Sequence, residues 1–254
     1  MIRFASLGSG SRGNATLIEA GATRILIDCG FTLAEAEQRL ARFGIELAAL
    51  DAIVVTHEHS DHLSGVGRLA RRHRVPVWMT HGTYAVWKDR EVPHALRFSP
   101  HQGFSIGALE IRPYPVPHDA REPCQYVIAA GGRRLGVLSD AGHVTPHMRA
   151  VLADCDALLL ECNHDPVMLR DGPYPASLKA RVGGDSGHLS NPQAAGLMRG
   201  YAHERLQHLV LTHLSEKNNT PALARTAIVD ALGMDAPWIV CADQDEGMAW
   251  REIA

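Results

Sequence analysis

The apolar positions of the chain follow two periods, the alternation of a β-strand and the longer repeat of a helix. Hairpin-like strands come first, and strands and helices then alternate to the end. We expect strands at 2–7, 14–19, 24–28, 51–55, 75–79, 109–116, 125–130, 133–138, 157–161, 209–212 and 238–241. We expect helices at 33–43, 63–73, 83–88, 146–153, 191–203 and 221–232.

This order of elements predicts two mixed sheets packed on each other with helices outside, a four-layer αββα sandwich of the α/β (α+β) class. A length of 254 residues is enough for one large domain, which we expect to cover residues 1–254. The sequence has no low-complexity segment and no repeat of fixed period. The runs 53–57 and 209–213 both end in Thr-His, but they are too short to prove duplication.

Composition narrows the functional classes. The 25 Lys and Arg against 28 Asp and Glu give a net charge of −3, so no global positive field attracts polyanions and any such contact must be local. Signal-peptide and membrane-spanning patterns are missing, so we expect a cytoplasmic protein without membrane contact. The 5 cysteines are scattered without C-x-x-C spacing, which favours small buried thiols over disulfides or a zinc knuckle.

Residues 57–62 read His-Glu-His-Ser-Asp-His and directly follow the apolar run 53–55. Imidazole and carboxylate are the ligands that Zn²⁺ and other borderline divalent metals select. The loop offers four of them, His57, His59, Asp61 and His62. Extended backbone would project the first three one way and the fourth the other, so we expect a turn here that lets them converge. The alternative is a solvated loop opening a helix, with Ser60 or Asp61 as cap.

Three more candidate ligands follow predicted strands. His213 follows the strand 209–212, Asp140 follows 133–138, and His118 follows a proline-rich run that cannot be helical at every X-Pro step. A single His or Asp at such a place is usually a cap or turn residue. Together with the 57–62 loop, the three complete a set of metal ligands.

The ordered set resembles the metal ligands of the metallo-β-lactamase superfamily, and the resemblance covers nearly the whole chain. It implies an αββα sandwich with two divalent ions, Zn²⁺ or Mn²⁺ with Fe²⁺ as a further option. One ion would be held by His57, His59 and His118, the other by Asp61, His62 and His213, with Asp140 bridging. His59 replaces the Glu of the redox di-iron branch, and His62 is typical of two-metal hydrolases, so the resemblance favours hydrolysis.

Glu161 and His188 resemble the pair found in ribonuclease Z and related phosphodiesterases, where the His protonates the leaving oxygen. A phosphodiester needs such an acid because its alkoxide is a poor leaving group. The resemblance therefore makes Glu161 and His188 candidate catalytic residues. The alternative is a strand-end carboxylate and a helix-entry imidazole. Asp61 is a third candidate, because with Asp140 it would position the hydroxide that two metal ions generate.

The stretches 6–14, 161–165, 172–179, 187–191 and 211–218 are similar to the YycJ/WalJ-like branch, which implies a metal-dependent 5′-to-3′ DNA exonuclease. The 72 residues between Asp140 and His213 are too few for the inserted domain of β-CASP nucleases. An RNA-processing nuclease, a thioester or lactam hydrolase and a metal-binding protein without turnover remain alternatives. The lack of a counterpart to the tRNA-gripping arm favours DNA over RNA. Oligomeric state stays open.

Glycine-rich segments supply candidate phosphate contacts. Gly8, Gly10 and Gly13 could turn backbone N–H groups toward an anion, and the segment 183–187 leads toward a helix N-terminus. A tight hairpin would need the same glycines. The candidate phosphate-binding residues are Ser9, Asn14, Asn163, Lys179 and Arg181.

Overall fold

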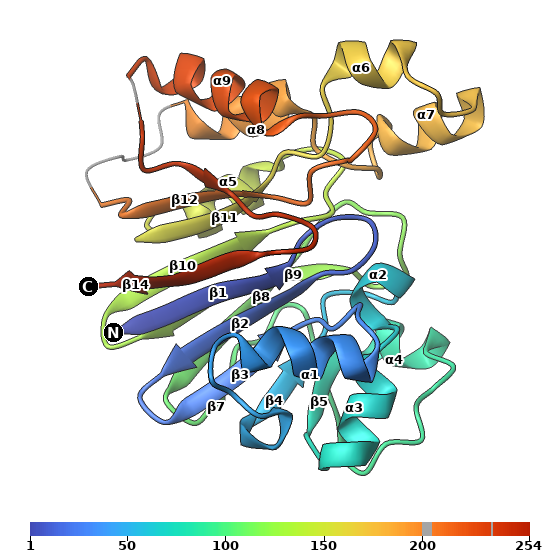
Figure 1. Ribbon diagram of the computed structural model, residues 1–254, viewed down its shortest axis with the longest axis vertical. Helices are drawn as coiled ribbons and strands as arrows, with labels where there is room; N and C mark the ends of the chain where they lie inside the picture. The colour runs from blue at the N-terminus through green and yellow to red at the C-terminus, as the bar shows by residue number, and fades with distance from the viewer. Residues whose placement is uncertain (200–204, 235) are drawn as a thin grey trace.

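Two seven-stranded mixed sheets lie face to face in the computed structural model of the chain, which describes residues 1–199, 205–234 and 236–254 (Figure 1). The first sheet has the order β14-β1-β2-β3-β4-β5-β6 and the second β13-β12-β11-β10-β9-β8-β7. The first contains β1 (Ile2–Gly8), β2 (Ala15–Ala20), β3 (Thr23–Ile27), β4 (Ala52–Val54), β5 (Val77–Thr80), β6 (Ala95–Phe98) and β14 (Met248–Ile253). The second contains β7 (Phe104–Ile106), β8 (Leu109–Pro115), β9 (Cys124–Ala130), β10 (Arg133–Leu138), β11 (Ala157–Glu161), β12 (His208–Thr212) and β13 (Val240–Cys241).

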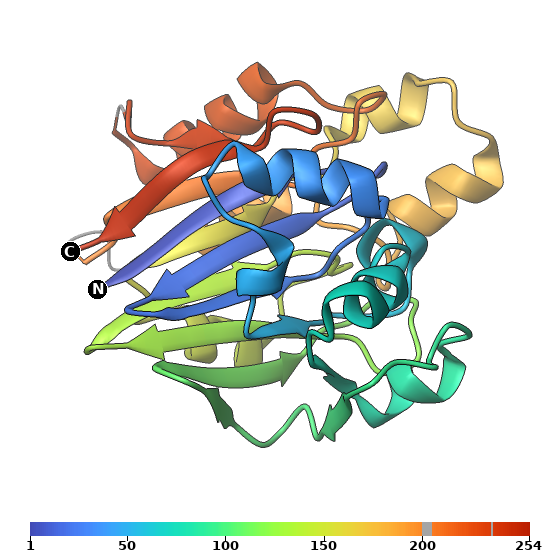
Figure 2. The same ribbon diagram turned by 60° about the horizontal axis from the view of Figure 1, so that its bottom comes forward.

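Helices cover the outer face of each sheet (Figures 1 and 2). The chain forms α1 (Leu33–Ala41), the 3-10 turn η1 (Leu47–Ala49), α2 (Ser60–Leu63), α3 (Val66–His73), α4 (His81–Val86), α5 (Pro146–Leu152), α6 (Pro166–Asp171), α7 (Ala176–Val182), α8 (Asn191–Met198) and α9 (Pro221–Leu232). Local signals start several of them. Thr32 and Glu35 form a capping box at α1, and Thr145 caps α5 ahead of Pro146.

Alternation along the strands builds three apolar layers. On β1, Ile2 and Phe4 face the second sheet, while Leu7 packs under the helices of the first sheet. On β11, Leu159 lies between the sheets and Leu158 packs under α5, α8 and α9. Each fully buried side chain of this size contributes about 1.5–3 kcal/mol. The four-layer sandwich expected from the sequence is therefore confirmed.

Several boundaries differ from the sequence expectation. The helix expected at 63–73 begins at Ser60 and is interrupted at Ser64 and Gly65. The helix expected at 191–203 ends at Met198, and residues 200–204, including His203, lie outside the described part of the chain. The other predicted elements match within two residues.

The strands β6, β7 and β14 and the helices α6 and α7 were not predicted. Their runs are short, between three and seven residues, so hydrophobic periodicity gives little signal there; β7 has three residues and α7 buries none of its seven.

The chain crosses between the sheets late, because β14 returns to the first sheet beside β1 after β13 has completed the second. The two termini consequently lie side by side (Figure 2). Because one apolar layer is shared by both sheets, we propose that residues 1–254 fold as one domain. Among the described residues no helix has the length and apolar character needed to cross a membrane.

Candidate active site

The candidate ligands gather at one edge of the sandwich, where strands of both sheets end. In the first sheet, β3 and β4 run parallel and lead into Asp28 and into the loop at 57–62. In the second sheet, β10, β11 and β12 run parallel and lead to Asp140, Glu161 and His213. Carboxyl ends of parallel strands meet at one edge, so residues far apart in sequence converge here.

Three of these strand-end residues have left-handed backbone. The φ angles are 61° at Asp28, 51° at Asp140 and 54° at His213. This region disfavours side chains other than glycine, by roughly 1–3 kcal/mol per residue, and such residues cluster at functional sites. The sharp turn at the end of each strand directs the side chain into the site instead of onto a sheet face.

The 57–62 loop changes conformation halfway. His59 is the extended N-cap of α2, and Asp61 and His62 belong to the helix. The expected turn is thus made by a helical first turn, and the cap is His59 in place of Ser60 or Asp61. Glu58 points elsewhere, because its Oε1 accepts a hydrogen bond from the backbone N–H of Arg121 at 2.7 Å.

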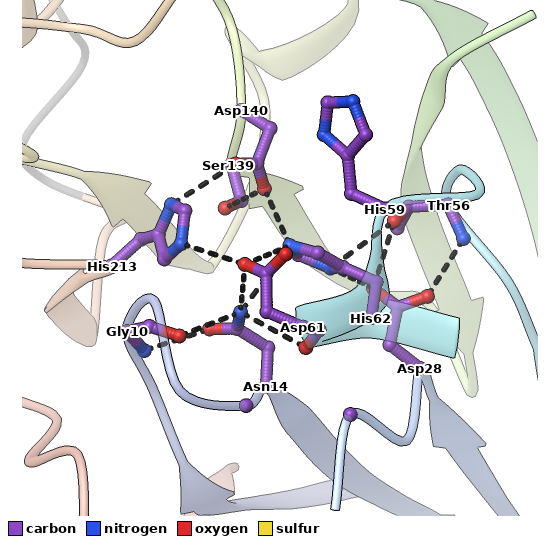
Figure 3. Close-up of polar contacts among 12 residues, drawn as sticks. Gly10, Asn14, Asp28, Thr56, His59, Asp61, His62, Ser139, Asp140 and His213 are labelled. Atoms are coloured by element: carbon purple, nitrogen blue, oxygen red, sulfur yellow. Dashed lines mark hydrogen bonds and ion pairs between the residues drawn. The ribbon is translucent and has the colours of Figure 1, made fainter. Parts of the chain in front are cut away.

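The structure brings the predicted ligands together in two groups. The donor atoms of His57, His59 and His118 lie within 4.8 Å of one another, and those of Asp61, His62 and His213 form a second such group. Asp140 lies between the groups. It shares a further donor cluster with His57 and His62, and its Oδ1 is 3.0 Å from His213 Nδ1 (Figure 3).

Unsatisfied buried nitrogens show that these residues fit a metal. His57 Nε2 and His213 Nε2 are buried and make no hydrogen bond within the described residues, although Asp61 Oδ2 lies 3.4 Å from the latter. The opposite nitrogens of these two rings are held: Nδ1 of His57 lies 2.9 Å from Thr56 Oγ1, and Nδ1 of His213 lies 3.2 Å from Glu161 Oε1. This is the arrangement of metal-bound histidines, whose second nitrogen is fixed by a neighbouring oxygen. The site is therefore suited to divalent metal ions.

Asp28 and Thr56 support the ligands and were not identified from the sequence. Asp28 Oδ2 accepts from His62 Nδ1 at 2.8 Å, and Asp28 Oδ1 accepts from the Thr56 N–H at 2.8 Å. His62 Nε2 then faces Asp140 Oδ2 at 3.2 Å (Figure 3). The one available signal was that Asp28 ends a predicted strand, as Asp140 does.

Charge is balanced inside the site. Burial alone would lower the pKa of His62, but Asp140 and Asp61 raise it well above its usual value, and Asp140 does the same for His213. Burial alone would raise the pKa of Asp140, but His213 and His62 bring it well below its usual range. Without metal, protonated imidazoles thus neutralise the carboxylates, in the place that a cation would otherwise take.

Two histidines of the other group favour the neutral form. Burial lowers the pKa of His57 and of His118, and the adjacent His62 and His188 imidazoles oppose protonation further. Neutral imidazole is the form that binds metal, so the surroundings of these two rings favour a cation.

Glu161 and His188 lie together as expected from the sequence. Glu161 is fully buried, and its Oε1 is 2.8 Å from His188 Nδ1. The same oxygen lies 3.2 Å from His213 Nδ1, and Oε2 accepts from the N–H groups of Ala141 and Leu189 at 3.0 Å. The carboxylate therefore orients His188 and one predicted metal ligand at once.

A cavity of about 320 Å³ opens over the predicted ligands. His59, Asp61, Asp140, His188 and His213 line it, so metal and acid candidates face one space. A larger hollow of about 600 Å³ lies over the outer face of β8 and β9 and contains none of the predicted ligands. Chemistry, not size, marks the smaller cavity as the site.

Only some of the candidate phosphate-binding residues line the cavity, and the others are bonded to the protein itself. Arg181 and Asn163 line the cavity, whereas Lys179 Nζ donates to the Arg170 carbonyl at 2.7 Å. Ser9 Oγ accepts from the His213 N–H at 2.9 Å, and Asn14 Nδ2 lies 3.2 Å from Asp61 Oδ2.

The glycine-rich segment is turned inward. The N–H groups of Ser9, Gly10, Arg12, Gly13 and Asn14 all donate to oxygens of the protein. None of these five N–H groups is free to bind a phosphate. The segment instead supports Asp61 and His213 through the hydrogen bonds of Asn14 and Ser9.

Comparison with known proteins identifies the family. The profile of the Beta-lactamase superfamily domain matches residues 23–214. The exodeoxyribonuclease YycJ of Bacillus anthracis is 34% identical over 91% of this chain and 89% of its own length. The exodeoxyribonuclease WalJ of Streptococcus pneumoniae serotype 2 is 33% identical over 91% of this chain and 88% of its own.

A solved structure shows the same fold. The metallo-β-lactamase fold protein YhfI of Bacillus subtilis superimposes with a TM-score of 0.76 at 17% identity, over 99% of this chain and all of that one. The chain belongs to the metallo-β-lactamase superfamily of hydrolases, in the branch that contains YycJ and WalJ.

Proposed function

We propose that this protein is a metal-dependent phosphodiester hydrolase and, more narrowly, a 5′-to-3′ DNA exonuclease. One observation carries the proposal: members of both groups of candidate metal ligands line the same cavity as His188, whose Nδ1 is held by the buried Glu161. Thioester or lactam hydrolysis needs a positioned acid less, so the pair favours a phosphodiester.

The metal part of the proposal is two divalent ions, Zn²⁺ or Mn²⁺, with Fe²⁺ as a further option. His57, His59 and His118 would hold one, Asp61, His62 and His213 the other, and Asp140 would contact both. When bound, such ions lower the pKa of a water and neutralise the charge that grows on the non-bridging phosphate oxygens.

The side chains of the protein supply positioning and a proton. Asp61 and Asp140 accept hydrogen bonds and would orient the attacking water in line with the scissile bond. His188 presents its Nε2 to the cavity, because Nδ1 is held by Glu161. We assign to His188 the proton that the departing 3′ oxygen takes up, and to Glu161 the orientation of that imidazole.

DNA is the proposed polymer because YycJ and WalJ, which are 34% and 33% identical to this chain, are named exodeoxyribonucleases. A net charge of −3 agrees with a substrate held by local contacts. A cytoplasmic location belongs to the same proposal. RNA is the rival substrate that the experiment must separate, because a 2′-hydroxyl is the one group that distinguishes it.

The test incubates metal-loaded protein with single- and double-stranded DNA and RNA, labelled at the 5′ or the 3′ end. Asp140→Ala serves as the inactive control. We expect DNA to be shortened from its 5′ end and the control to be inert. Digestion of RNA alone would replace the DNA assignment, and turnover of a thioester without digestion of any polymer would refute the nuclease.

A further inference from the structure

One wall of the cavity is formed by α7 and the turn that connects it to α6. This hairpin projects from the sandwich beside the site (Figures 1 and 2). Tyr174, Leu178, Arg181 and Val182 face the cavity from it. None of these four is a predicted metal ligand or part of the Glu161–His188 pair. These side chains therefore have no role in the proposed hydrolytic step.

Arg181 is aimed by Asp119. Its Nε donates to Asp119 Oδ2 at 2.5 Å, and Asp119 Oδ1 lies 3.6 Å from His118 Nε2 and 3.8 Å from His59 Nε2. The Asp119 N–H also donates to the Ser186 carbonyl at 3.0 Å. Asp119 therefore ties the end of α7 to the loop that carries a predicted metal ligand, and it sets the guanidinium beside the metal site.

The guanidinium retains unused donors. Asp119 takes Nε, and neither Nη1 nor Nη2 has a hydrogen bond to the described residues. The side chain is 55% exposed. Among the described residues that line the cavity, Arg181 is the one Lys or Arg. A fork of free N–H groups in a cavity otherwise rich in carboxylates and imidazoles is suited to a phosphate.

Tyr174 supplies an aromatic face nearby. It lies between Pro173 and Pro175, which restrict its backbone before any ligand binds. The ring is half-buried at the cavity and its hydroxyl makes no hydrogen bond to the described residues. Aromatic side chains held in this way stack on nucleobases without regard to sequence.

We propose that this wall is a nucleotide subsite: Arg181, aimed by Asp119, binds a phosphate next to the scissile one, and Tyr174 stacks on the attached base. The inference rests on the proposed nuclease function and extends it to substrate positioning. A cavity of about 320 Å³ is at the small end of ligand sites, in keeping with one nucleotide at a time. Asp119 is a positioning residue in this scheme.

The first experiment measures binding apart from turnover. Metal-free protein is titrated against a short fluorescein-labelled single-stranded DNA by anisotropy over a series of salt concentrations. We expect Arg181→Gln to weaken binding about tenfold and to reduce the slope of log Kd against log salt by about 0.7. Arg181→Lys should recover the salt slope and part of the affinity, because it keeps the charge but loses the fork.

Arg170→Gln is the matched control, because Arg170 lies on α6, is 68% exposed and pairs with Asp171 outside the cavity. It should behave as wild type. Tyr174→Leu should weaken binding at least about fivefold, and Tyr174→Phe should not.

The second experiment uses metal-loaded enzyme and DNA. Arg181→Gln and Asp119→Asn should raise KM about tenfold with little change in kcat, and metal content should stay at the wild-type level. A drop in thermal stability with no change in KM or salt slope would show that the Asp119–Arg181 pair merely pins α7. Loss of metal in Asp119→Asn would make Asp119 a support of the metal site and would refute its positioning role.

The two proposals fail in different ways. DNA binding that depends on Arg181, without digestion, would refute the nuclease and leave the subsite. Digestion and binding unaffected by Arg181→Gln would refute the subsite and leave the nuclease. No DNA binding by metal-free wild type would also refute the subsite.

Discussion

Asp28 Oδ2 accepts a hydrogen bond from His62 Nδ1 at 2.8 Å, across 34 positions of the sequence. Both side chains are buried, and the contact fixes which ring nitrogen of His62 faces Asp61 and Asp140. The carboxylate thus sets the tautomer and the orientation of a predicted metal ligand without touching the metal position itself.

Replacing Asp28 should weaken metal binding. Loss of such a supporting carboxylate typically costs about tenfold to a hundredfold in metal affinity, so we expect a decrease of this size in Asp28→Asn, measured by chelator competition. Asp156→Asn is the control, since Asp156 is equally buried but pairs with Arg133 away from the site. Equal metal affinity in Asp28→Asn and wild type would contradict the role.

His188 and Asp61 should separate chemistry from metal binding. His188→Ala should keep its metal and lose about 10²–10⁴-fold in kcat, because the acid is gone, whereas Asp61→Ala should lose both. The losses of metal and of kcat in Glu161→Gln should lie between those of His188→Ala and Asp61→Ala, because Glu161 Oε1 contacts His213 as well as His188. Metal analysis and turnover are measured on the same samples. Equal metal loss in His188→Ala and Asp61→Ala would remove the separate role of His188.

How much of this site the sequence predicted depended on spacing along the chain. The 57–62 loop presents four candidate ligands together, and His118, Asp140 and His213 stand at strand ends, so pattern and resemblance predicted all seven as ligands, and the structure brings them together. Asp28 and Asp119 were not identified from the sequence, because only the fold brings their partners close to them. Neither has a neighbour in sequence that suggests its role.

Backbone conformation was the other feature hidden from the sequence. A non-glycine residue gives no sign of a positive φ, so the turns at Asp28, Asp140 and His213 could not be anticipated. The helices α6 and α7 were not predicted from the sequence for a different reason. The two helices are short and only Leu169 among their residues is buried, and hydrophobic periodicity marks only faces that are buried.

Metal-free protein should lose stability as pH rises. Carboxylates raise the folded-state pKa of His62 and His213 above the usual value of 6.5. Their contribution is therefore fully present below the unfolded pKa and is lost as pH rises through the folded pKa. Thermal unfolding of metal-free protein, measured at a series of pH values from below 6.5 upward, tests this dependence. A flat profile would argue against protonated imidazoles in the empty site.

Metal affinity should have the opposite dependence on pH. Because metal must displace the protons on His62 and His213, its affinity should rise with pH and its binding should release protons. Calorimetric titrations in buffers of different ionisation enthalpy would count those protons. Uptake or no exchange would contradict the expectation.

The thiols should be unreactive in the folded protein. Burial raises the pKa of Cys29 and of Cys124 to about 12, and it also raises the pKa of Cys162 and of the half-buried Cys241 above the usual value. The thiolate is the reactive form, so a thiol reagent at neutral pH should label Cys241 slowly and the others barely. Denatured protein should react at all 5 positions. Fast labelling of Cys29 in folded protein would show that its surroundings open.

The two groups of candidate ligands at one edge of the sandwich are proposed to hold a pair of divalent ions. Elemental analysis of purified protein, combined with anomalous diffraction at the metal edges, measures how many ions are bound and where. We predict about two ions per chain, one among His57, His59 and His118 and one among Asp61, His62 and His213. No bound metal, or metal found only away from Asp140, would contradict the claim.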